Sequence, residues 1–379
     1  MESQKNRKKE GLIWVLIIAF LIGMLIFFSW FFFLRFEEST DDAYVHGNLL
    51  RINSEIPGRV VAIYVEDTDY VEEGQLLAQL DPTNFQLALD KSEQLLGEAV
   101  RQVLAMDLKV EELKAERLVK EIELIRAEQD FQHRTPLLSR GAVSREEFEH
   151  SEYHFASAKA SLQATEALLK EAILKSKCSS LRTHPLVMKA AAEVKQALLN
   201  VRRCQIIAPK SGYIAMRNIQ LGELIEPSQA LLALIPLTDL WVNANFKEVQ
   251  LSNMRLGQKV TLRSDLYGSK KVFEGRVVGI TPGTGNTFSL LPPQNATGNW
   301  IKIVQRVPVR IQLLPRELDS FPLWLGLSMK ATVDIRDQQG AILKESVRLS
   351  PMQRTSLYEK QMEGADELIN RIIEENGGL

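Results

Sequence analysis

A repeat that is split into two distant halves constrains this chain more than any other feature of its sequence. Residues 52–82 and 206–236 align without a gap, at a constant offset of 154 positions. The identical pairs include Gly58 and Gly212, Glu72 and Glu226, Gln75 and Gln229, Leu77 and Leu231, Leu80 and Leu234, and Pro82 and Pro236. An internal repeat usually indicates an array of stacked units, but here only two copies flank one long insertion. The pattern predicts two halves of one small β domain that is opened to hold the insertion.

Each half of the repeat is predicted to consist of short strands and tight turns. In the first half, short apolar segments are broken by Pro57-Gly58, by residues 67–69 and by Glu73-Gly74, which is typical of β structure. We expect Gly58 and Gly74 to supply positive backbone φ angles, since glycine adopts them without steric cost. In the second half we predict Gly212 and Gly222 as structural turn positions.

The insertion, residues 83–205, is dominated by helix-forming residues and carries a heptad pattern. Between Pro82 and Pro136 there is no proline and only one glycine, Gly97. Apolar residues seven apart, with their companions, form a coiled-coil seam at Leu89, Leu96, Val103 and Val110, and at Ala99, Met106 and Leu113. Beyond this point Leu118, Ile122 and Ile125 continue the stripe from a new start, which predicts a stutter.

The insertion is predicted to fold back on itself as an antiparallel coiled-coil hairpin. We expect the outgoing helix to stop at Thr135-Pro136 and the tip to span residues 135–144. Ser144 and Glu147 form a capping box that starts the return. The returning seam pairs large residues with small ones, at Phe148, Phe155, Leu162 and Leu169 and at Ser151, Ala158, Thr165 and Ala172. After a break at residues 179–185 helix resumes, and the equal arms predict a hairpin about 75 Å long.

The N-terminal region carries a predicted membrane anchor. Residues 12–34 are 23 consecutive uncharged residues, enough for a transmembrane helix of about 35 Å. A cleaved signal peptide is the alternative, but the apolar run is longer than usual and no small-x-small cleavage site follows it. The preceding tail, residues 1–11, is basic, and acidic residues follow the span. The tail is therefore predicted to be cytoplasmic, with the bulk of the chain on the other side of the membrane.

Composition and spacing exclude several classes of function. The chain has 46 basic and 48 acidic residues, and no basic block beyond the N-terminal tail, so a nucleic-acid partner is not expected. Cys178 and Cys204 lack any metal-ligand spacing and are predicted to be unpaired thiols. His150 and His154 are four residues apart but lack the HExxH order, which favours a solvated helix face over a metal site. Since no catalytic arrangement stands out, we predict a non-enzyme without metal or cofactor.

The part of the chain that follows the second half-repeat is predicted to be a small antiparallel β-barrel, residues 237–337. Its expected strands lie within residues 240–246, 259–263, 271–280, 303–314 and 328–335. Residues 281–300 form a long loop rich in Gly, Pro and Asn, and loops of this length in compact domains are often functional. The candidate assembly or transport-path residues in it are Asn286, Phe288, Asn295 and Trp300. We interpret residues 35–51 as a linker and residues 338–379 as a polar tail with a short helix at 358–375.

Several segments carry a resemblance to a known family. Residues 57–60 and 71–81 closely resemble the first half of a lipoyl or biotinyl hammerhead domain, and residues 207–214 resemble the second. Such carrier domains present a modified lysine where this chain has residues 81–84 and then the hairpin, so no covalent cofactor is expected. A hammerhead split by a coiled-coil hairpin behind an N-terminal anchor resembles the periplasmic adaptor, or membrane fusion, proteins of the HlyD type. Further likeness to the EmrA branch of that family lies in residues 40–45, 240–248, 283–286 and 294–309.

The resemblance implies a mixed α and β fold with a mechanical function. Such an adaptor sits in the inner membrane of a Gram-negative bacterium as a single-pass protein, with its bulk in the periplasm. The resemblance further implies a homo-oligomer, either a trimer or a hexamer. This assembly would link a major-facilitator drug/proton antiporter to a TolC-like outer-membrane channel and export hydrophobic toxic compounds. An adaptor of a type I protein or peptide secretion system is the alternative. A membrane-anchored carboxyl or acyl carrier would require a modified lysine near Pro82.

The resemblance also points to the hairpin tip as the contact with the outer-membrane channel. Many adaptors of the wider family place Arg, Leu and Ser there at fixed spacing. Leu137 and Ser144 keep the Leu-to-Ser spacing, whereas His133 takes the Arg position. The candidate channel-contact residues are therefore His133, Arg134, Leu137, Leu138 and Ser144. From the residues alone, Ser144 is also explained as a helix cap, and the two leucines as packing of the tip.

Overall fold

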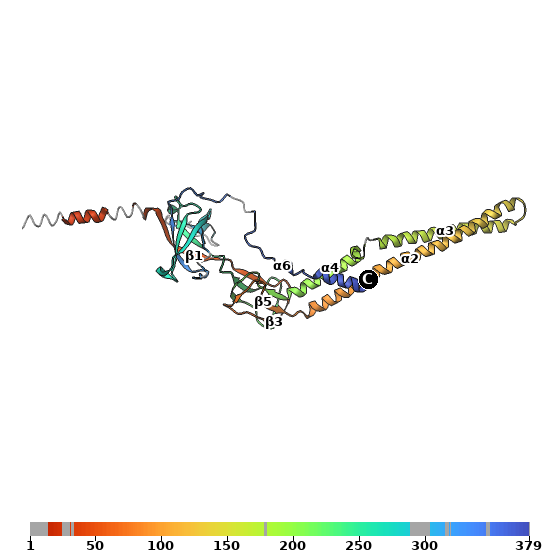
Figure 1. Cartoon of the computed structure of the whole chain (residues 1–379), viewed down its shortest axis with the longest axis horizontal. Coiled ribbons are helices and arrows are strands. Elements are labelled where there is room, and N and C mark those ends of the chain that lie inside the picture. The colour runs from red at the N-terminus through yellow and green to blue at the C-terminus, as the bar shows by residue number, and fades with distance from the viewer. Residues whose placement is uncertain are drawn as a thin grey trace, which may run out of the picture.

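The computed structural model describes residues 14–24, 31, 34–177, 180–288, 304–314, 318, 320–345 and 349–378. The chain is mixed α and β, and a barrel, a split β domain and a long helical hairpin follow one another along its long axis (Figure 1). Residues 14–24 of the predicted anchor are helical, whereas residues 12–13, 25–30 and 32–33 lie outside the described residues. Within the described ranges, no helix is both long enough and apolar enough to cross a membrane.

Two four-stranded sheets build the split domain, and each takes strands from both halves of the repeat. The strands are β2 (Leu50–Asn53), β3 (Gly58–Ile63), β4 (Tyr70–Val71), β5 (Leu76–Leu80), β6 (Gln205–Ile207), β7 (Gly212–Arg217), β8 (Leu224–Ile225) and β9 (Ala230–Ile235). The strand orders of the two sheets are β2-β9-β7-β4 and β6-β5-β3-β8. Strands β2, β3, β4 and β5 correspond in the repeat to β6, β7, β8 and β9, and replacing each strand by its counterpart turns one order into the other. The two halves therefore interlock around one core, in which the equivalent residues Leu77 and Leu231 are fully buried.

Unusual backbone angles in the split domain recur at the offset of the repeat. Thr68 has a φ of 77° and Gly222 a φ of 81°, and Gly74 and Ser228 have φ angles of 84° and 69°. The members of each pair stand 154 residues apart. A positive φ is therefore a property of the turn in both halves, although glycine occupies only one position of each pair. Gly74 and Gly222 lie at turns, as predicted.

Gly58 and Gly212 serve a purpose different from a turn. The positive φ predicted for Gly58 is wrong, because both glycines are the first residues of strands, β3 and β7, and neither has a positive φ. A Cβ atom on Gly212 would lie 2.5 Å from the carbonyl oxygen of Ile235, and one on Gly58 would lie 3.3 Å from Cδ1 of Leu80. At Gly212 the backbone of the neighbouring strand approaches too closely for a side chain, whereas at Gly58 the contact would be a tight one with the side chain of Leu80.

The described strands outside the split domain close into a barrel in the order β1-β10-β13-β12-β11-β14. Their bounds are β1 (Glu37–His46), β10 (Trp241–Lys247), β11 (Lys259–Ser264), β12 (Phe273–Ile280), β13 (Arg306–Leu313) and β14 (Ser328–Asp334). Five of these strands fall in the predicted runs. The interpretation of residues 35–51 as a linker is wrong, because β1 pairs with both β10 and β14 and closes the barrel. Its inward residues, Thr40, Ala43 and Val45, are buried and alternate with mostly polar neighbours that hid the strand pattern.

A long helical hairpin extends from the split domain. Helix α2 (Thr83–Ser139) has 57 residues and is about 85 Å long. The return consists of α3 (Arg145–Ser176), the short 3-10 helix η2 (Leu181–Thr183) and α4 (Pro185–Arg203). The predicted stop at Thr135-Pro136 is wrong, since α2 contains Pro136 in its last turns. Proline lacks the N–H that would donate to the carbonyl four residues earlier, and α2 ends only three residues beyond Pro136.

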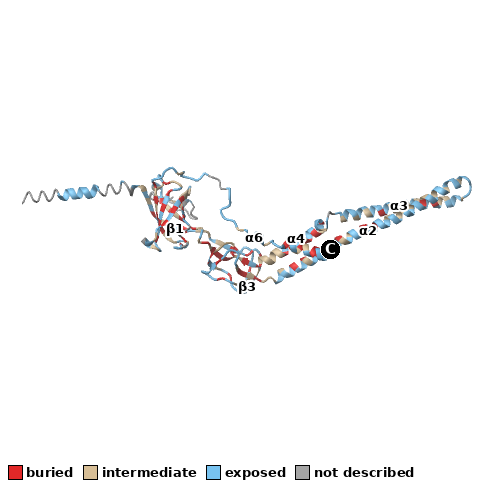
Figure 2. Cartoon of the chain, in the orientation of Figure 1, coloured by how far each residue is buried: buried red, intermediate tan, exposed pale blue. Residues whose placement is uncertain are grey.

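The heptad register of α2 continues to the distal end, so the predicted stutter is wrong. The predicted proximal seam is confirmed, since Leu89, Leu96, Val103 and Val110 are buried. Further along, the buried or half-buried residues keep spacings of three and four at Leu113, Arg117, Lys120, Leu124 and Ala127. The distal stripe, which we define as Leu118, Ile122 and Ile125, is 56%, 44% and 47% exposed. Most of the distal hairpin is coloured as exposed in Figure 2. Polar residues thus occupy two positions of the seam, and an apolar stripe faces outward.

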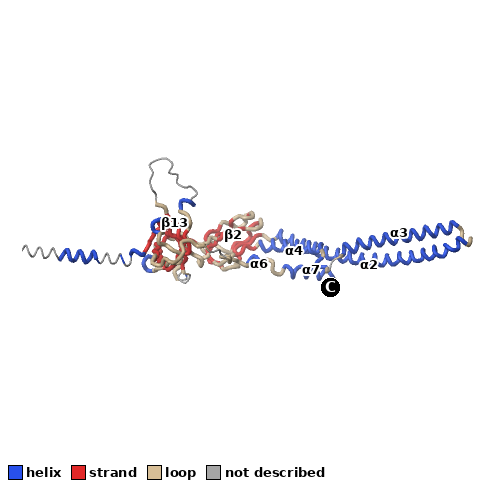
Figure 3. Tube along the Cα trace, turned by 90° about the horizontal axis from the view of Figure 1, so that it is seen from above, coloured by secondary structure: helices blue, strands red, loops and turns tan. Residues whose placement is uncertain are grey.

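The C-terminal segment ends in a buried helix, so its interpretation as a polar tail is wrong. It forms α6 (Leu357–Lys360) and α7 (Ala365–Gly377) where one helix was predicted at residues 358–375. Helix α7 lies along α2 and α4 at the base of the hairpin (Figure 3). Its Ile369, Ile372 and Ile373 are buried on one face. Their spacing is that of an amphipathic helix, which the polar composition of the segment concealed.

Candidate functional site

The turn at the hairpin tip is built from backbone hydrogen bonds. Arg140 is the C-cap residue of α2, and Gly141 follows with a φ of 66°. The N–H of Gly141 donates to the carbonyl of Leu138, and the N–H of Ala142 donates to the carbonyl of Leu137, both at 3.0 Å. This pair of bonds is a Schellman motif, which satisfies carbonyl groups that the helix end leaves free. It ends α2 beyond the proline.

The returning helix starts with the predicted capping box, which is confirmed. The Ser144 hydroxyl accepts from the N–H of Glu147 at 3.2 Å, and the N–H of Ser144 donates to Glu147 Oε2 at 2.9 Å. The backbone N–H of Ser144, and then its hydroxyl, lowers the pKa of Glu147. From the other arm, Arg134 donates to the carbonyl of Glu147 at 3.1 Å and to Asp130 Oδ1 at 3.1 Å. Arg134 therefore joins the two arms at the tip, and Ser144 fixes the start of the returning arm.

The structure gathers the tip candidates at the far end of the hairpin. His133, Arg134, Leu137 and Leu138 lie in the last turns of α2, and Ser144 lies across the turn. His133 and Leu137 are exposed, whereas Leu138 is half-buried. Arg134 and Ser144 are engaged in the contacts above, so His133 and Leu137 offer the free side chains. Contact with a channel stays a prediction.

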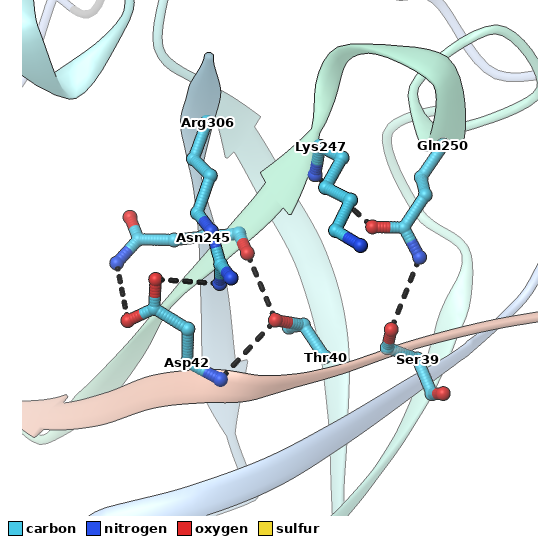
Figure 4. Close-up of polar contacts among 7 residues, drawn as sticks. All are labelled: Ser39, Thr40, Asp42, Asn245, Lys247, Gln250 and Arg306. Carbon is cyan, nitrogen blue, oxygen red and sulfur yellow. Dashed lines mark hydrogen bonds and ion pairs between the residues drawn. The ribbon is translucent and has the colours of Figure 1, made fainter. Parts of the chain in front are cut away.

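A polar cluster ties β1 to β10 and β13 of the barrel (Figure 4). Asp42 accepts from Arg306 Nη1 at 2.7 Å and from Asn245 Nδ2 at 3.1 Å. The Thr40 hydroxyl donates to the carbonyl of Asn245 at 2.9 Å, where a register shift between Thr40 and Ala43 interrupts the pairing of β1 with β14. Because Arg306 is the first residue of β13, Asp42 fixes the point where the chain re-enters the barrel after the long loop.

A second set of contacts joins the residues that follow β10 to the start of β1. Gln250 Nε2 donates to the carbonyl of Ser39 at 3.0 Å (Figure 4). It also donates to Glu38 Oε2 at 2.9 Å. The N–H of Lys247 donates to Gln250 Oε1 at 3.0 Å. Sequence reasoning placed residues 240–246 and 303–314 in strands and used residues 40–45 only for a resemblance, so it missed these contacts. The sequence did show polar residues in these segments to which no partner was assigned. The structure explains them by contacts between neighbouring strands of the barrel.

The loop candidates are placed only in part. Asn286 and Phe288 lie in the 3-10 helix η5 (Gly285–Phe288), which contacts β13. The start of the loop is held by the N–H of Thr281, which donates to the carbonyl of Pro308 at 3.0 Å. Asn295 and Trp300 lie outside the described residues. The assembly or transport role of these four residues stays a prediction.

The described residues offer no evident chemistry of a reaction centre. In the ranges that the structure describes, no group of His, Cys, Asp or Glu side chains is placed to hold a metal ion. His150 and His154 are exposed on α3. Cys204 is a buried free thiol, and its burial, with a smaller effect of Asp81, raises its pKa to about 11. Such a thiol is protonated and inert at neutral pH.

A split β domain that carries a long helical hairpin and continues into a small barrel defines the class of membrane fusion, or periplasmic adaptor, proteins. The family model "EMRA, alpha-helical hairpin domain" matches residues 83–204. The multidrug export protein EmrA of Haemophilus influenzae is 40% identical over 376 residues, which are 99% of this chain and 96% of that protein. The chain belongs to the EmrA family of membrane fusion proteins.

Two further comparisons concern the same family. The multidrug export protein EmrA of Escherichia coli K12 is 40% identical over 351 residues, 92% of this chain and 90% of that protein. A solved structure of the periplasmic adaptor protein EmrA superposes on 79% of this chain and 98% of its own, with 22% identity and a TM-score of 0.40. The family assignment rests on the sequence relatives.

Proposed function

We propose that this chain is the periplasmic adaptor of a tripartite multidrug efflux pump. The observation that carries the proposal is its 40% identity, over almost the full length of both chains, to a multidrug export protein. The adaptor would link a major-facilitator antiporter in the inner membrane to a TolC-like channel in the outer membrane. Its part is mechanical, since it encloses a path for hydrophobic toxic compounds and catalyses no reaction.

We place the adaptor in a Gram-negative inner membrane through a single span, residues 12–34, with the N-terminus in the cytoplasm. The 23 uncharged residues of this span support the proposal. So do the apolar side chains of residues 14–24, among which Trp14 is 65% and Phe20 is 72% exposed. The barrel follows directly and would lie near the membrane, with the hairpin tip farthest from it in the periplasm (Figure 1).

The outer surface of the hairpin supports association with other helices. The distal stripe places three large apolar side chains on one exposed face of α2. An exposed apolar stripe of this kind is unfavourable in water and is typical of a surface that packs against another helix. Neighbouring copies in a trimer or hexamer, or helices of the channel, would cover it.

The tip and the loop are proposed as the two ends of the assembly. At the tip, His133 and Leu137 would contact the channel directly, while Arg134 and Ser144 hold the turn in shape and Leu138 packs beneath it. Near the membrane, the loop that holds Asn286, Phe288, Asn295 and Trp300 would contact a neighbouring copy or line the path. The ion pair of Asp42 with Arg306 would fix the end of that loop, which supports a positioned rather than a free loop.

Drug sensitivity of a host that lacks its own adaptor tests the proposal. The variant Ile122→Glu, on the distal stripe, is expected to leave the host as sensitive to a hydrophobic drug as a strain without adaptor. Gln129→Glu adds the same charge at an exposed position of the same helix and is expected to export normally. Membrane levels of both variants are measured by immunoblot. If deletion of the hairpin leaves drug sensitivity unchanged, the proposed function fails.

Crosslinking tests the partners separately. With a photoreactive residue at position 137, the full-length chain is expected to capture an outer-membrane channel. With one in the N-terminal span, it is expected to capture an inner-membrane antiporter. Capture of an ATP-driven exporter instead would favour the secretion alternative.

A further inference from the structure

The C-terminal segment contacts each domain in turn on its way to the hairpin. At the barrel, the carbonyl of Ala341 accepts from the N–H of Leu256 at 2.9 Å. At the junction between the split domain and the barrel, Gln353 Nε2 donates to Asp239 Oδ2 at 3.1 Å. The segment then reaches α6 and α7 at the base of the hairpin (Figure 1). The segment therefore runs along the long axis of the molecule from the barrel to the base of the hairpin (Figure 1).

Arg202, near the end of α4, fixes the entry of α7. Its guanidinium group donates to the carbonyl oxygens of Lys360 and Gln361, and to that of Glu363 at 2.6 Å. These carbonyl groups lie around the end of α6, and that of Lys360 also accepts from the N–H of Glu363 at 3.0 Å. Hydrogen bonds from a charged group are the stronger kind, and three of them converge here.

Helix α7 fills the groove between α2 and α4. Ile369, Ile372 and Ile373 pack in one core with residues of both helices, including the fully buried Val100 and Val194. The fit on α2 is close at Gly97, where a Cβ atom would lie 2.9 Å from Oδ1 of Asn376. The base of the hairpin is thus a bundle of three helices, whereas the distal part consists of α2 and α3.

The three-helix base coincides with the interruption of the returning arm. Within that interruption, Arg182 of η2 pairs with Glu374 of α7 at 3.0 Å, and Leu181 packs on the same core. On α4, Lys195 pairs with Asp366 at 2.6 Å. Helix α7 therefore contacts the returning arm on α4 and again within η2.

Among the described residues, which omit 178 and 179, few hydrogen bonds bridge the interruption without α7. His184 joins its two sides, since its Nδ1 accepts from the N–H of Leu186 at 3.3 Å and its Nε2 lies 3.2 Å from the carbonyl of Lys175. Ser176 also bonds to Asp107 of α2. Without α7, α2 is the helix that packs against both α3 and α4 and so links the two sides of the interruption. Long helices are rarely straight, and they curve gently.

We propose that α7 is a splint that stiffens the base of the hairpin and thereby fixes the direction of its distal part relative to the split domain. The three isoleucines and the ion pairs to Arg182 and Lys195 hold the splint on the interrupted arm. When α7 is released, the distal hairpin bends over a wider range of angles about the point where α3 gives way to α4.

Spin-label distances in the full-length chain test the splint. One label replaces Leu174, on α3 just before the interruption, and the other replaces Leu221, in the split domain; both residues are exposed. The background lacks Cys178 and Cys204, and labelled copies are diluted with unlabelled ones. The variant Ile369→Glu/Ile372→Glu is expected to broaden the distance distribution at least twofold. Glu367→Gln, on the exposed face of the same helix, is expected to leave it unchanged.

Two controls make the outcome decisive. Faster tryptic cleavage at Arg371, by about tenfold or more, shows that α7 has been released. If α7 is released and the distance distribution between positions 174 and 221 stays narrow, the splint proposal is refuted. If the double substitution does not speed cleavage, a chain that ends at residue 356 is measured instead, because it lacks α7 altogether. A narrow distribution in that shortened chain also refutes the proposal. A second label pair, at Tyr64 and Leu221 within the split domain, is expected to keep its distance; if it broadens too, α7 supports that domain and is not a splint.

Discussion

Two leucines of α2, five residues apart, give a direct test of the hairpin register. Leu113 lies in the seam and is 5% exposed, whereas Leu118 lies on the distal stripe and is 56% exposed. Truncation of a buried leucine to alanine costs about 2–4 kcal/mol, from lost burial and the cavity left behind. For Leu118→Ala the loss is below about 1 kcal/mol, because much of the side chain is already in water and alanine favours the helix.

Amide hydrogen exchange in the full-length chain measures this difference without isolating the hairpin. At protein concentrations too low for assembly, Leu113→Ala is expected to speed exchange of the neighbouring α2 amides about 30- to 900-fold, the equivalent of 2–4 kcal/mol. Leu118→Ala is expected to speed it less than about fivefold. If the two substitutions have equal effects, the seam slips at this point and the uninterrupted register is wrong.

Three further predictions concern the split domain and the tip. Leu77→Ala and Leu231→Ala occupy equivalent positions of the interlocked halves, so denaturant unfolding should show equal losses, each about 2–5 kcal/mol. Gly212→Ala forces a Cβ atom against a carbonyl oxygen and should lower the unfolding midpoint by the equivalent of about 1–3 kcal/mol. The capping bonds lower the pKa of Glu147, so the stability they add is present above its ordinary pKa of 4.5 and is lost as the pH falls through the lowered value. Amide exchange at the start of α3 should show this pH dependence, and Ser144→Ala, which removes the hydroxyl but keeps the backbone N–H, should weaken it without abolishing it.

The features that sequence reasoning predicted correctly depend on local spacing. The proximal seam and the capping box are patterns within one helix, and the five later barrel strands are short runs between turn residues. The repeat was also visible, since its halves keep the same spacing of apolar and turn residues. The tip candidates were placed together because a hairpin with equal arms brings one short stretch to its end.

The features that sequence reasoning missed depend on partners far away in the chain. The strand β1 shows little apolar alternation of its own, and its pairing with β10 and β14 decides its structure. The apolar pattern of Leu118, Ile122 and Ile125 suggested a seam, but α3 packs on the positions that continue the earlier register. In the candidate site, Asp42 and Arg306 are 264 positions apart, and nothing in either segment predicts the pair.

The sequence alone therefore determined the split repeat, the helical insertion and its caps, because these follow from the conformational preferences and spacing of neighbouring residues. Only the tertiary structure decided which faces are buried. It interlocked the two halves of the repeat, closed the barrel with β1, turned the distal stripe outward and placed α7 on the base of the hairpin. The physical reason is that burial is a property of two surfaces, and a sequence pattern describes only one of them.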